Sequence, residues 1–279
     1  MWVGQQLADG LDFWGFLGSL ILGGIILGIY TGLLGYVGAK TGLSLDLLSQ
    51  RAFGEKGSYL PSAMTSFTQI GWFSVGSFVS GGTATPNFAR FAKNGKSGAI
   101  TTVVAFFIGN SLMFFFGAVS SIFVGGNDIF EVMVRLNLFY LAVLVLGLNI
   151  WTTNDNALYT AGLGLANIFH QRKKPMVLLS GIIGTVASVW LYYNFCGWLN
   201  VLNCTLPPVG MILVLAYFMN KKDFETDQPK LKTVDWFAVA GVILGAIVAN
   251  LLHWGIASIN GMVVAAVCYC VGQAVNKRK

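Results

Sequence analysis

The sequence predicts an all-α membrane protein, a polytopic helical bundle with about eight apolar segments. Of the 279 residues, 55% are hydrophobic and only 10% are charged. The mean hydropathy of +0.70 lies far above that of soluble domains. The net charge of +6 comes largely from short basic clusters between or after the apolar runs. Such clusters are typical of topology signals in membrane proteins and not of a nucleic-acid surface.

The apolar segments follow one another along the chain with short polar connections. They span residues 13–38, 59–90, 99–124, 137–168, 176–194, 197–219, 236–252 and 255–274. Each is long enough to cross the hydrocarbon core as a helix, which needs about 17 to 25 residues. Closely spaced glycines in the first segment give it narrow faces for close helix contact. The loop after it contains a short amphipathic stretch at 43–48.

Segment 59–90 is abnormal for a single helix. Gly76, Gly81, Gly82 and Pro86 interrupt it, and serine and threonine residues fill the gaps. Broken helices at membrane depth are tolerated only where the freed backbone groups face protein or a wet cavity. The pattern therefore predicts a position inside the bundle for this segment.

The basic loops indicate the orientation of the chain. Clusters such as 172–174 and 277–279 alternate with connections that are not basic, near Asn127, Phe195 and His253, which places the basic loops and the C-terminus in the cytoplasm. The count fails at the first loop, because Arg51 and Lys56 are also basic but a single crossing over 59–90 puts them outside. Either the first loop is an exception, or 59–90 enters and leaves on the same side as a re-entrant pair of half helices.

A polar knot over 147–159 interrupts the segment 137–168 near its middle. Polar groups at that depth are kept where they line a cavity, contact each other or hold a ligand. Asn149, Thr152 and Thr153 fall at i, i+3 and i+4, so they share one helical face. They offer a backbone carbonyl and two hydroxyl oxygens, which are hard neutral ligands suited to a small alkali cation.

Other reactive side chains give weaker signals. Asp155 is the one carboxylate inside a span, and it either takes part in proton coupling or has a hydrogen-bonded structural role beside Asn154 and Asn156. The four cysteines show no CxxC or Cys/His metal spacing and are interpreted as buried small apolar residues. The sequence contains no Walker loop, GxSxG, HExxH or dinucleotide fingerprint. We therefore expect neither an enzyme nor a cofactor.

Five motifs carry a family resemblance that covers nearly the whole chain. They are GYVGAKTG at 35–42, QIGWF at 69–73, GNSLMF at 109–114, LNIWTTNDNALY at 148–159 and PPVG at 207–210. Together they resemble the bacterial cytosine permeases of the nucleobase-cation symporter family. The resemblance implies a LeuT-type fold, with twelve spans in an inverted repeat of five plus five helices followed by two more.

The chain departs from that pattern in two places. It lacks most of the first helix, and it passes from the third helix into the sixth between Gly76 and Ser77. We therefore expect an incomplete LeuT-type bundle that forms one transporter domain. Its parts are 1–12 as the remnant of the first broken helix, 59–90 as the fused third and sixth helices, and 236–279 as two accessory helices. The join explains the failed charge count, since both flanking loops are cytoplasmic in the family.

The resemblance also implies the function. It predicts a multi-pass transporter of the bacterial inner membrane that imports cytosine, coupled to sodium by alternating access. A related purine, pyrimidine or hydantoin is the alternative substrate, and coupling to protons instead of sodium stays open. The alternative for this chain is an internally deleted membrane fragment that cannot transport. No nucleic-acid partner is expected, and the oligomeric state is open.

The resemblance assigns the substrate site to five residues. Trp72 and Phe78 are the candidate aromatic faces that hold a flat heterocycle between them, and Gln69, Ser80 and Asn154 are the candidate hydrogen-bonding partners of its edge. Gln69 precedes Trp72 by three residues, so on a helix both can point to the same side. Without the resemblance, the rings are equally ordinary core- or lipid-facing aromatics and the amides interhelical contacts.

The resemblance places sodium on the same face that the spacing singles out, at Asn149, Thr152 and Thr153. In the family this site is shared with carbonyl groups of the broken first helix. Those partner carbonyls are missing from this chain, so the sodium site is expected to be weak.

Overall fold

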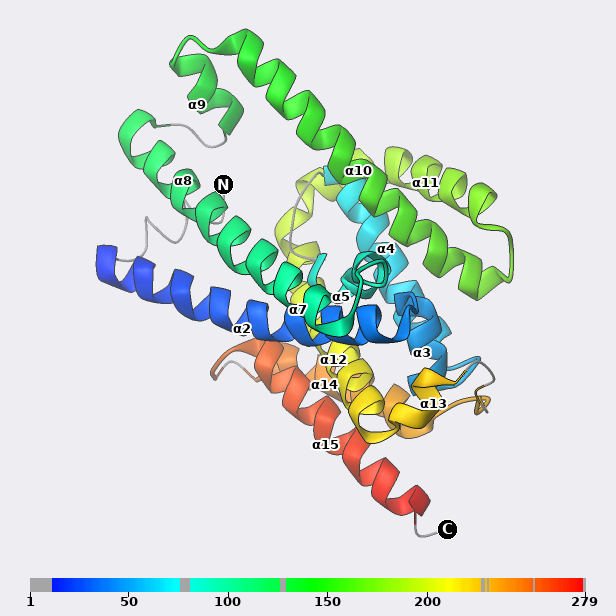
Figure 1. Cartoon of the computed structure of the whole chain (residues 1–279). Coiled ribbons are helices and arrows are strands. Elements are labelled where there is room, and N and C mark those ends of the chain that lie inside the picture. Colours follow the sequence, from blue (N-terminus) through cyan, green and yellow to red (C-terminus); the bar gives the residue numbers. More distant parts are fainter. Residues whose placement is uncertain are drawn as a thin grey trace.

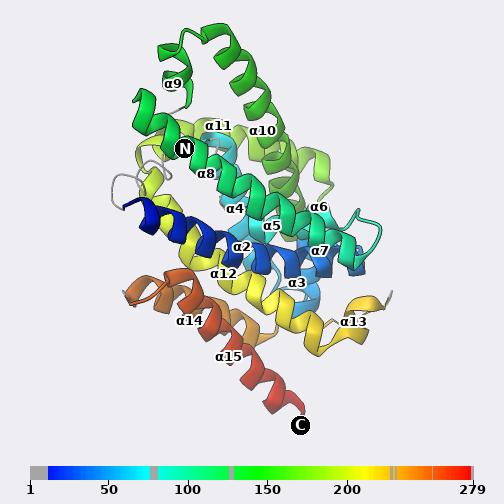
Figure 2. The same cartoon turned by 60° about the vertical axis from the view of Figure 1, so that its left-hand side comes forward.

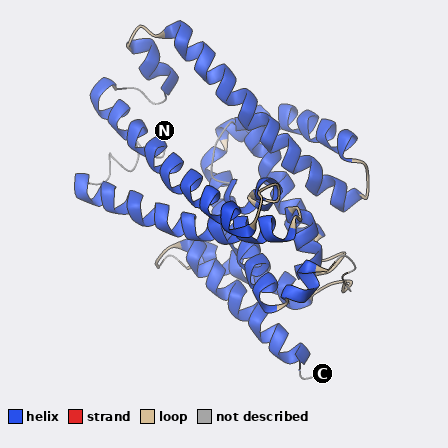
Figure 3. Cartoon of the chain, viewed as in Figure 1, coloured by secondary structure: helices blue, strands red, loops and turns tan. Residues whose placement is uncertain are grey.

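The computed structural model describes residues 12–75, 81–125, 129–226, 229, 231–252 and 254–277. Within its helices, the side chains of residues 72–75, 81, 82, 121, 150, 192, 195, 196 and 277 are left out of the description. Throughout the described residues the chain forms helices and connecting loops and no strand, which confirms the predicted all-α class (Figure 3).

The described helices follow the predicted apolar segments. They are α2 (Phe13–Thr41), α3 (Leu45–Phe53), α4 (Tyr59–Val75), α5 (Gly81–Ala84), α6 (Pro86–Ala89), α7 (Gly95–Val104), the π-helix η1 (Ala105–Gly109), α8 (Asn110–Val124), α9 (Ile129–Arg135), α10 (Phe139–Phe169), α11 (Lys173–Tyr193), α12 (Phe195–Met219), α13 (Lys221–Glu225), α14 (Trp236–Leu251) and α15 (Ala257–Lys277). Among them, α2, the run from α7 to α8, α11, α12 and α15 are long and apolar enough to cross a membrane, and α14 is a shorter apolar helix.

Local signals set several helix ends. Asp12, Ser44 and Asn94 are N-cap residues whose side chains accept hydrogen bonds from the backbone N–H groups of α2, α3 and α7. These bonds satisfy N–H groups that have no partner inside the helix. The helix α2 ends at Gly42, whose φ of 68° lies in the left-handed region that glycine adopts at low energetic cost.

The helices pack in three groups (Figures 1 and 2). In the first group, α2 packs against α5, α6, α7, η1 and α8. In the second, α4, α10 and α11 pack against each other. In the third, α12, α14 and α15 do the same. The molecule is therefore built from packed helix bundles that α3 connects, since α3 contacts α4, α10, α12 and α14.

Glycines allow α2 to lie very close to its neighbours. A Cβ atom on Gly32 would lie 2.6 Å from Cγ2 of Val103 in α7, and one on Gly38 would lie 2.7 Å from the Cα atom of Pro86 in α6. A side chain at either position would push these helices apart. The close contact is the reason that small residues are frequent where transmembrane helices cross.

The amphipathic stretch in the first loop becomes a buried helix. Leu45, Leu48 and Phe53 of α3 are fully buried, in one cluster with Leu34 of α2 and Ile212 of α12. The helix is thus inserted between the bundles and does not lie on the outside of the protein. It connects the first and third helix groups through apolar packing.

The turn after α3 is fixed by backbone hydrogen bonds to the connection before α14. The N–H groups of Glu55 and Lys56 donate to the carbonyls of Lys232 and Thr233 over 2.8 and 2.9 Å, and Asp235 N–H donates to the carbonyl of Phe53 over 2.6 Å. These bonds attach the accessory helices α14 and α15 to the start of α4.

The loops that carry the basic residues lie together at one end of the molecule. Arg51 donates to the carbonyl of Asp223 in α13 over 2.8 Å, and the hydroxyl of Tyr59 lies 2.7 Å from Nε2 of His170, which ends α10. The end of α6 lies beside the same helix, because Arg90 donates to the hydroxyl of Tyr159. Both ends of 59–90 therefore lie near α3 and the end of α10, the arrangement that entry and exit on one side requires. Residues 76–80 lie outside the described part.

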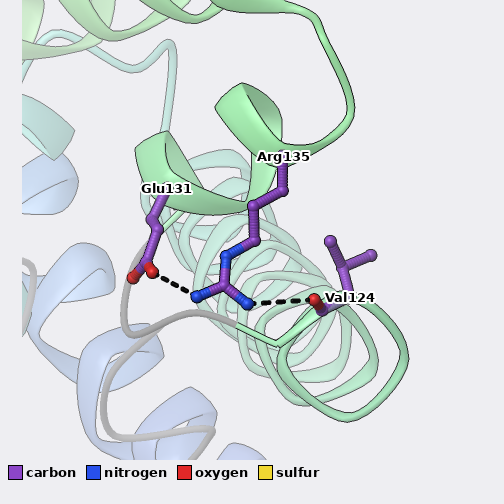
Figure 4. Close-up of polar contacts among 3 residues, drawn as sticks. All are labelled: Val124, Glu131 and Arg135. Atoms are coloured by element: carbon purple, nitrogen blue, oxygen red, sulfur yellow. Dashed lines mark hydrogen bonds and ion pairs between the residues drawn. The ribbon is translucent and has the colours of Figure 1, made fainter.

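The opposite end of the molecule contains α9 and the start of α10 (Figure 1). There Arg135 bonds a carboxylate oxygen of Glu131 over 2.5 Å and the carbonyl of Val124 over 3.3 Å (Figure 4). The guanidinium group thereby satisfies a carbonyl at the C-terminal end of α8, where a positive charge is favourable. The exposed ion pair itself contributes little to stability.

Candidate functional site

A cavity of about 790 Å³ lies between the first and second helix groups. Its walls come from α5, α6, α7 and η1 on one side and from α4 and α10 on the other. This volume falls in the range of about 300–1,000 Å³ that is usual for small-molecule sites. The lining residues are Gln69, Ala84, Thr85, Phe88, Ala89, Phe91, Ala92, Lys93, Ser97, Gly98, Thr101, Thr102, Ala105, Phe106, Thr153, Asn156, Ala157 and Thr160.

The second helix group supplies the polar wall of the cavity. Thr153, Asn156 and Thr160 follow one another at i, i+3 and i+7 on α10, so they form one stripe along the helix. Gln69 reaches the same cavity from α4. Amide and hydroxyl groups of these four residues can both donate and accept hydrogen bonds, as the recognition of a polar neutral molecule requires.

The first helix group supplies the aromatic wall. Phe88 lies on α6, which begins at Pro86, and Phe106 lies on η1. The π-helical turn of η1 interrupts the regular helix between α7 and α8 next to the cavity, and π-helical turns are frequent at functional sites. Aromatic rings opposite amide and hydroxyl groups suit a flat heterocycle.

The structure brings two of the predicted site residues together, Gln69 from the substrate set and Thr153 from the cation set. Asn154 does not line the cavity. Its side chain is half-buried on another face of α10, and its Oδ1 atom is buried without a hydrogen-bond partner in the described part of the chain. Phe78, Ser80 and the side chain of Trp72 lie outside the described residues. Their roles stay predictions.

The remaining cation candidates lie farther along α10 from the cavity. Asn149 and Thr152 are exposed, and the hydroxyl of Thr152 donates to the carbonyls of Leu148 and Asn149 over 3.2 and 3.1 Å. The carbonyl of Asn149 therefore accepts a bond from within its own helix. Asp155 is exposed on the same helix. In the described residues, no group of three or more His, Cys, Asp or Glu side chains is arranged to hold a metal ion.

Sequence reasoning missed most of the cavity wall. Asn156 was considered as a neighbour of Asp155, although its position three residues after Thr153 was a sequence signal for the shared stripe. Phe88 and Phe106 gave no signal of their own in a chain with 14% aromatic residues. Their place in the wall depends on how α6 and η1 pack against α10.

A second polar site lies at the rim of the bundle, where a carboxylate is buried. Asp46 of α3 is only 5% exposed, and its Oδ1 atom accepts a hydrogen bond of 2.6 Å from Ser62 of α4. The amide nitrogen of Asn167 in α10 donates to the hydroxyls of Ser58 and Ser62 over 3.1 and 2.9 Å. Its amide oxygen accepts a hydrogen bond of 2.6 Å from the amide nitrogen of Gln50. The network attaches α3 to α4 and α10 of the second group.

Burial raises the pKa of the Asp46 carboxyl from 3.8 to about 6, while the bond from Ser62 and the charge of Arg90 act in the opposite direction. The folded protein therefore binds this proton more tightly than the unfolded chain does. The associated stability is fully present below about pH 4 and is lost as the pH rises through about 6.

Asp46→Asn is expected to remove this pH dependence, because asparagine keeps an oxygen that accepts from Ser62 and has no charge to bury. The unfolding temperature of the unaltered protein should fall relative to that of the variant as the pH rises from 4 to 7, in thermal denaturation in detergent. Asp155→Asn, which removes an exposed carboxylate, is the control and should keep the fall. Equal pH profiles for the unaltered chain and Asp46→Asn would contradict the prediction.

The sequence comparisons agree with one another. A family model described as a permease for cytosine/purines, uracil, thiamine and allantoin matches residues 1–84 and 74–275. Two relatives, the cytosine permeases of Escherichia coli strain K12 and of E. coli O157:H7, are each 36% identical over 372 aligned residues. The alignments cover 100% of this chain and 88% of each relative.

A solved structure shows the same fold. Mhp1 is described as a nucleobase-cation-symport-1 family transporter in a closed conformation with bromovinylhydantoin bound. It matches with a TM-score of 0.76 at 14% identity, over 97% of this chain and 87% of that chain. The likeness confirms the predicted transporter fold, with its broken and packed helices.

Proposed function

Because the chain belongs to the family of permeases for cytosine/purines, uracil, thiamine and allantoin, we propose that it imports cytosine by secondary active transport. Membership of this family makes it a multi-pass membrane transporter and not an enzyme. A related purine, pyrimidine or hydantoin is the alternative substrate. The family is described as a permease for several such molecules, and the Mhp1 structure contains a bound hydantoin.

The cavity between the first and second helix groups is the observation that supports this proposal most directly. Alternating access moves one group of helices against the other around a site near the middle of the membrane. A cavity walled by both groups is therefore in the position where such a movement opens or closes it. Its polar wall with Gln69 and Asn156, opposite its aromatic wall with Phe88 and Phe106, suits a flat polar base.

Sodium is the proposed coupling ion. Thr153 lies in the cavity wall, next to the substrate space, and Asn149 and Thr152 continue up the same helix. Hydroxyl and carbonyl oxygens are suitable ligands for a small alkali cation. The ligands that this chain supplies in the described residues are few, so we expect weak sodium binding, and a proton is the alternative coupling ion.

Thr153→Ala is expected to reduce the sodium dependence of cytosine binding, because it removes the hydroxyl oxygen that faces the cavity. The measurement is cytosine affinity in detergent with sodium and with an equal concentration of choline. Thr185→Ala is the control, since Thr185 is exposed on α11 and its hydroxyl donates to the carbonyl of Gly181 within that helix. An equal response to sodium in the unaltered chain and in Thr153→Ala would exclude Thr153 from the cation site.

The proposed location is the bacterial inner membrane, with the C-terminus in the cytoplasm. The positive-inside rule supports this orientation, because the loops with Arg51, Arg172 and Lys222 lie at the same end of the molecule as Arg90. The count of basic residues per loop fails when 59–90 is treated as a single crossing. It agrees with the positive-inside rule if both ends of 59–90 lie at that end of the molecule.

A second candidate function is an internally deleted form that binds substrate but does not complete transport. The family model matches in two stretches that overlap at 74–84, which is where the sequence suggested a join. The alignment with the E. coli cytosine permeases spans 372 positions, although this chain has 279 residues. Both observations support a loss of internal segments that the relatives contain.

Uptake and binding of radiolabelled cytosine distinguish the two candidates. The full chain is reconstituted in liposomes, and uptake is measured with an inward sodium gradient, with equal sodium and in empty liposomes. Uptake that depends on the gradient supports transport. Saturable binding with uptake equal to that of empty liposomes supports the deleted form. Absence of both would overturn cytosine as the substrate.

A further inference from the structure

The buried carboxylate of Asp46 and the guanidinium group of Arg90 have no assigned function, and they belong to the two sides of the junction between α3 and α6. Arg90 follows α6 directly, between Ala89 and Phe91, both of which line the cavity. Asp46 lies in the first turn of α3. The charge of Arg90 acts on the carboxyl of Asp46, yet no ion pair between them is present in the described part of the chain.

Arg90 is held on α10. Its Nη2 atom donates to the hydroxyl of Tyr159, and its guanidinium carbon lies 4.7 Å from the ring centroid of Phe91. The ring of Tyr159 is fixed by Lys173, whose Nζ atom lies 3.6 Å from the ring centroid, and by Phe88 at 6.2 Å between centroids. The contact therefore connects the first helix group to the second beside the cavity.

The hydrogen bonding of Arg90 is incomplete. Its Nε atom is buried and has no hydrogen-bond partner among the described residues. A buried N–H group of a cation is unfavourable when it has no hydrogen-bond acceptor, and an anionic acceptor would form a strong bond with it. The side chain of Ser62 donates a hydrogen bond to the carboxyl of Asp46. Burial disfavours the ionised form of this carboxyl, so a nearby cation would stabilise it.

A second contact holds α3 and α6 together and keeps the two groups near each other. The amide oxygen of Asn87 in α6 accepts 2.8 Å from the N–H of Leu45 at the start of α3, and its nitrogen lies 3.5 Å from the hydroxyl of Thr160 in α10. Asn87 is fully buried. Asn87 and Arg90 are three residues apart, so the bond from Leu45 to Asn87 places the chain segment of Arg90 next to the first turn of α3, which contains Asp46.

We propose that Asp46 and Arg90 form a proton-controlled latch: Arg90 donates to Tyr159 while Asp46 is protonated, and it turns to Asp46 when that carboxyl loses its proton to solvent. The exchange moves a cation from α10 to α3 at the edge of the cavity. It thereby loosens the link between α6 and α10 when the surrounding pH is high and strengthens it when the pH is low.

The pKa of about 6 supports this exchange, because it places the ionisation of Asp46 near neutral pH. Several other titratable or charged groups on the elements around α3 have partners of their own. Tyr59 bonds His170, Tyr217 bonds Glu225, Lys232 pairs with Asp235, Arg51 bonds the carbonyl of Asp223, and Lys221 lies over the ring of Phe218. Arg90 is the cation whose charge acts on the carboxyl of Asp46.

The latch is tested by the unfolding temperatures of the full chain and its variants at pH 5 and pH 8 in one detergent. Arg90→Gln is expected to lower the unfolding temperature more at pH 8 than at pH 5, because at pH 8 it leaves a buried anion alone. In the Asp46→Asn background, Arg90→Gln should have the same effect at both pH values. In an Asp155→Asn background, the difference between the pH values should persist.

Tyr159→Phe gives the reciprocal result, because it removes only the hydroxyl group to which Arg90 donates at low pH. Its effect on the unfolding temperature should be larger at pH 5 than at pH 8. Equal effects at both pH values would overturn the proposal, even if Asp46→Asn failed to fold. A pH difference for Arg90→Gln that persists in Asp46→Asn would also overturn it. The test needs no substrate, so its failure would leave the proposed transport function unaffected.

Discussion

Replacing Gln69 with alanine is expected to weaken cytosine binding by about 5- to 150-fold. Gln69 is a substrate residue predicted from the sequence that the structure places in the cavity wall. An amide that bonds the edge of a base contributes about 1–3 kcal/mol once its loss leaves a buried polar group unpaired, which corresponds to that range of affinity. Binding of radiolabelled cytosine to the purified protein measures the effect.

The matched control is Gln171→Ala, because Gln171 is an exposed glutamine in the connection between α10 and α11. It should bind cytosine as the unaltered chain does. The unfolding temperature of both variants shows whether a loss of binding reflects the site or the fold. A folded Gln69→Ala variant with unchanged affinity would remove Gln69 from the substrate site.

Replacing Gly164 with leucine is expected to destabilise the protein by about 3 kcal/mol or more, because it forces apart helices that are in direct contact. A Cβ atom at this position of α10 would collide with the hydroxyl of Ser66 and lie 2.8 Å from the carbonyl oxygen of Ser62, both in α4. It would also lie 3.5 Å from Oδ1 of Asp46. The substitution would therefore disrupt the close contact between α4 and α10, on which the second helix group and the Asp46 network depend.

Gly147→Leu is the control: it makes the same change on the same helix, at a position where no described atom lies near the added Cβ atom. A Cβ atom on Gly147 would meet nothing within 4 Å, so its effect on the free energy of unfolding should stay within about 0.5 kcal/mol. Thermal unfolding in detergent compares the two variants. Similar unfolding temperatures for Gly164→Leu and Gly147→Leu would show that the crossing of α4 and α10 tolerates a side chain.

Some residues of the candidate site could be predicted from the sequence around them, and others are placed there only by helices distant in sequence. The expectation for Gln69 came from the family resemblance and that for Thr153 from the spacing of polar residues on one helical face, and both residues lie in the cavity wall. Phe88 and Phe106 were not predictable, because an apolar side chain in an apolar helix is compatible with lipid, core or cavity alike. Which of these it meets depends on helices distant in sequence.

Asp46 shows the same limit for a charged residue. In the sequence it is an acidic residue in a polar loop with an amphipathic stretch, and its ordinary position is at the surface. The apolar side of α3 packs against α2 and α12, and this packing places Asp46 beneath α4 and α10. Its raised pKa follows from that burial alone, and no local pattern contains the information.

The sequence by itself determined that the chain is an all-α membrane protein, where its apolar segments lie and to which family it is similar. These properties are set by composition, by the length of apolar runs and by motifs of neighbouring residues, all of which are local. Only the tertiary structure decided that α3 is buried, that the cavity lies between two helix groups and that Asp46 is buried within the influence of the Arg90 charge. Such contacts arise from how helices cross, and a crossing depends on complementary side chains that the chain brings together from far apart.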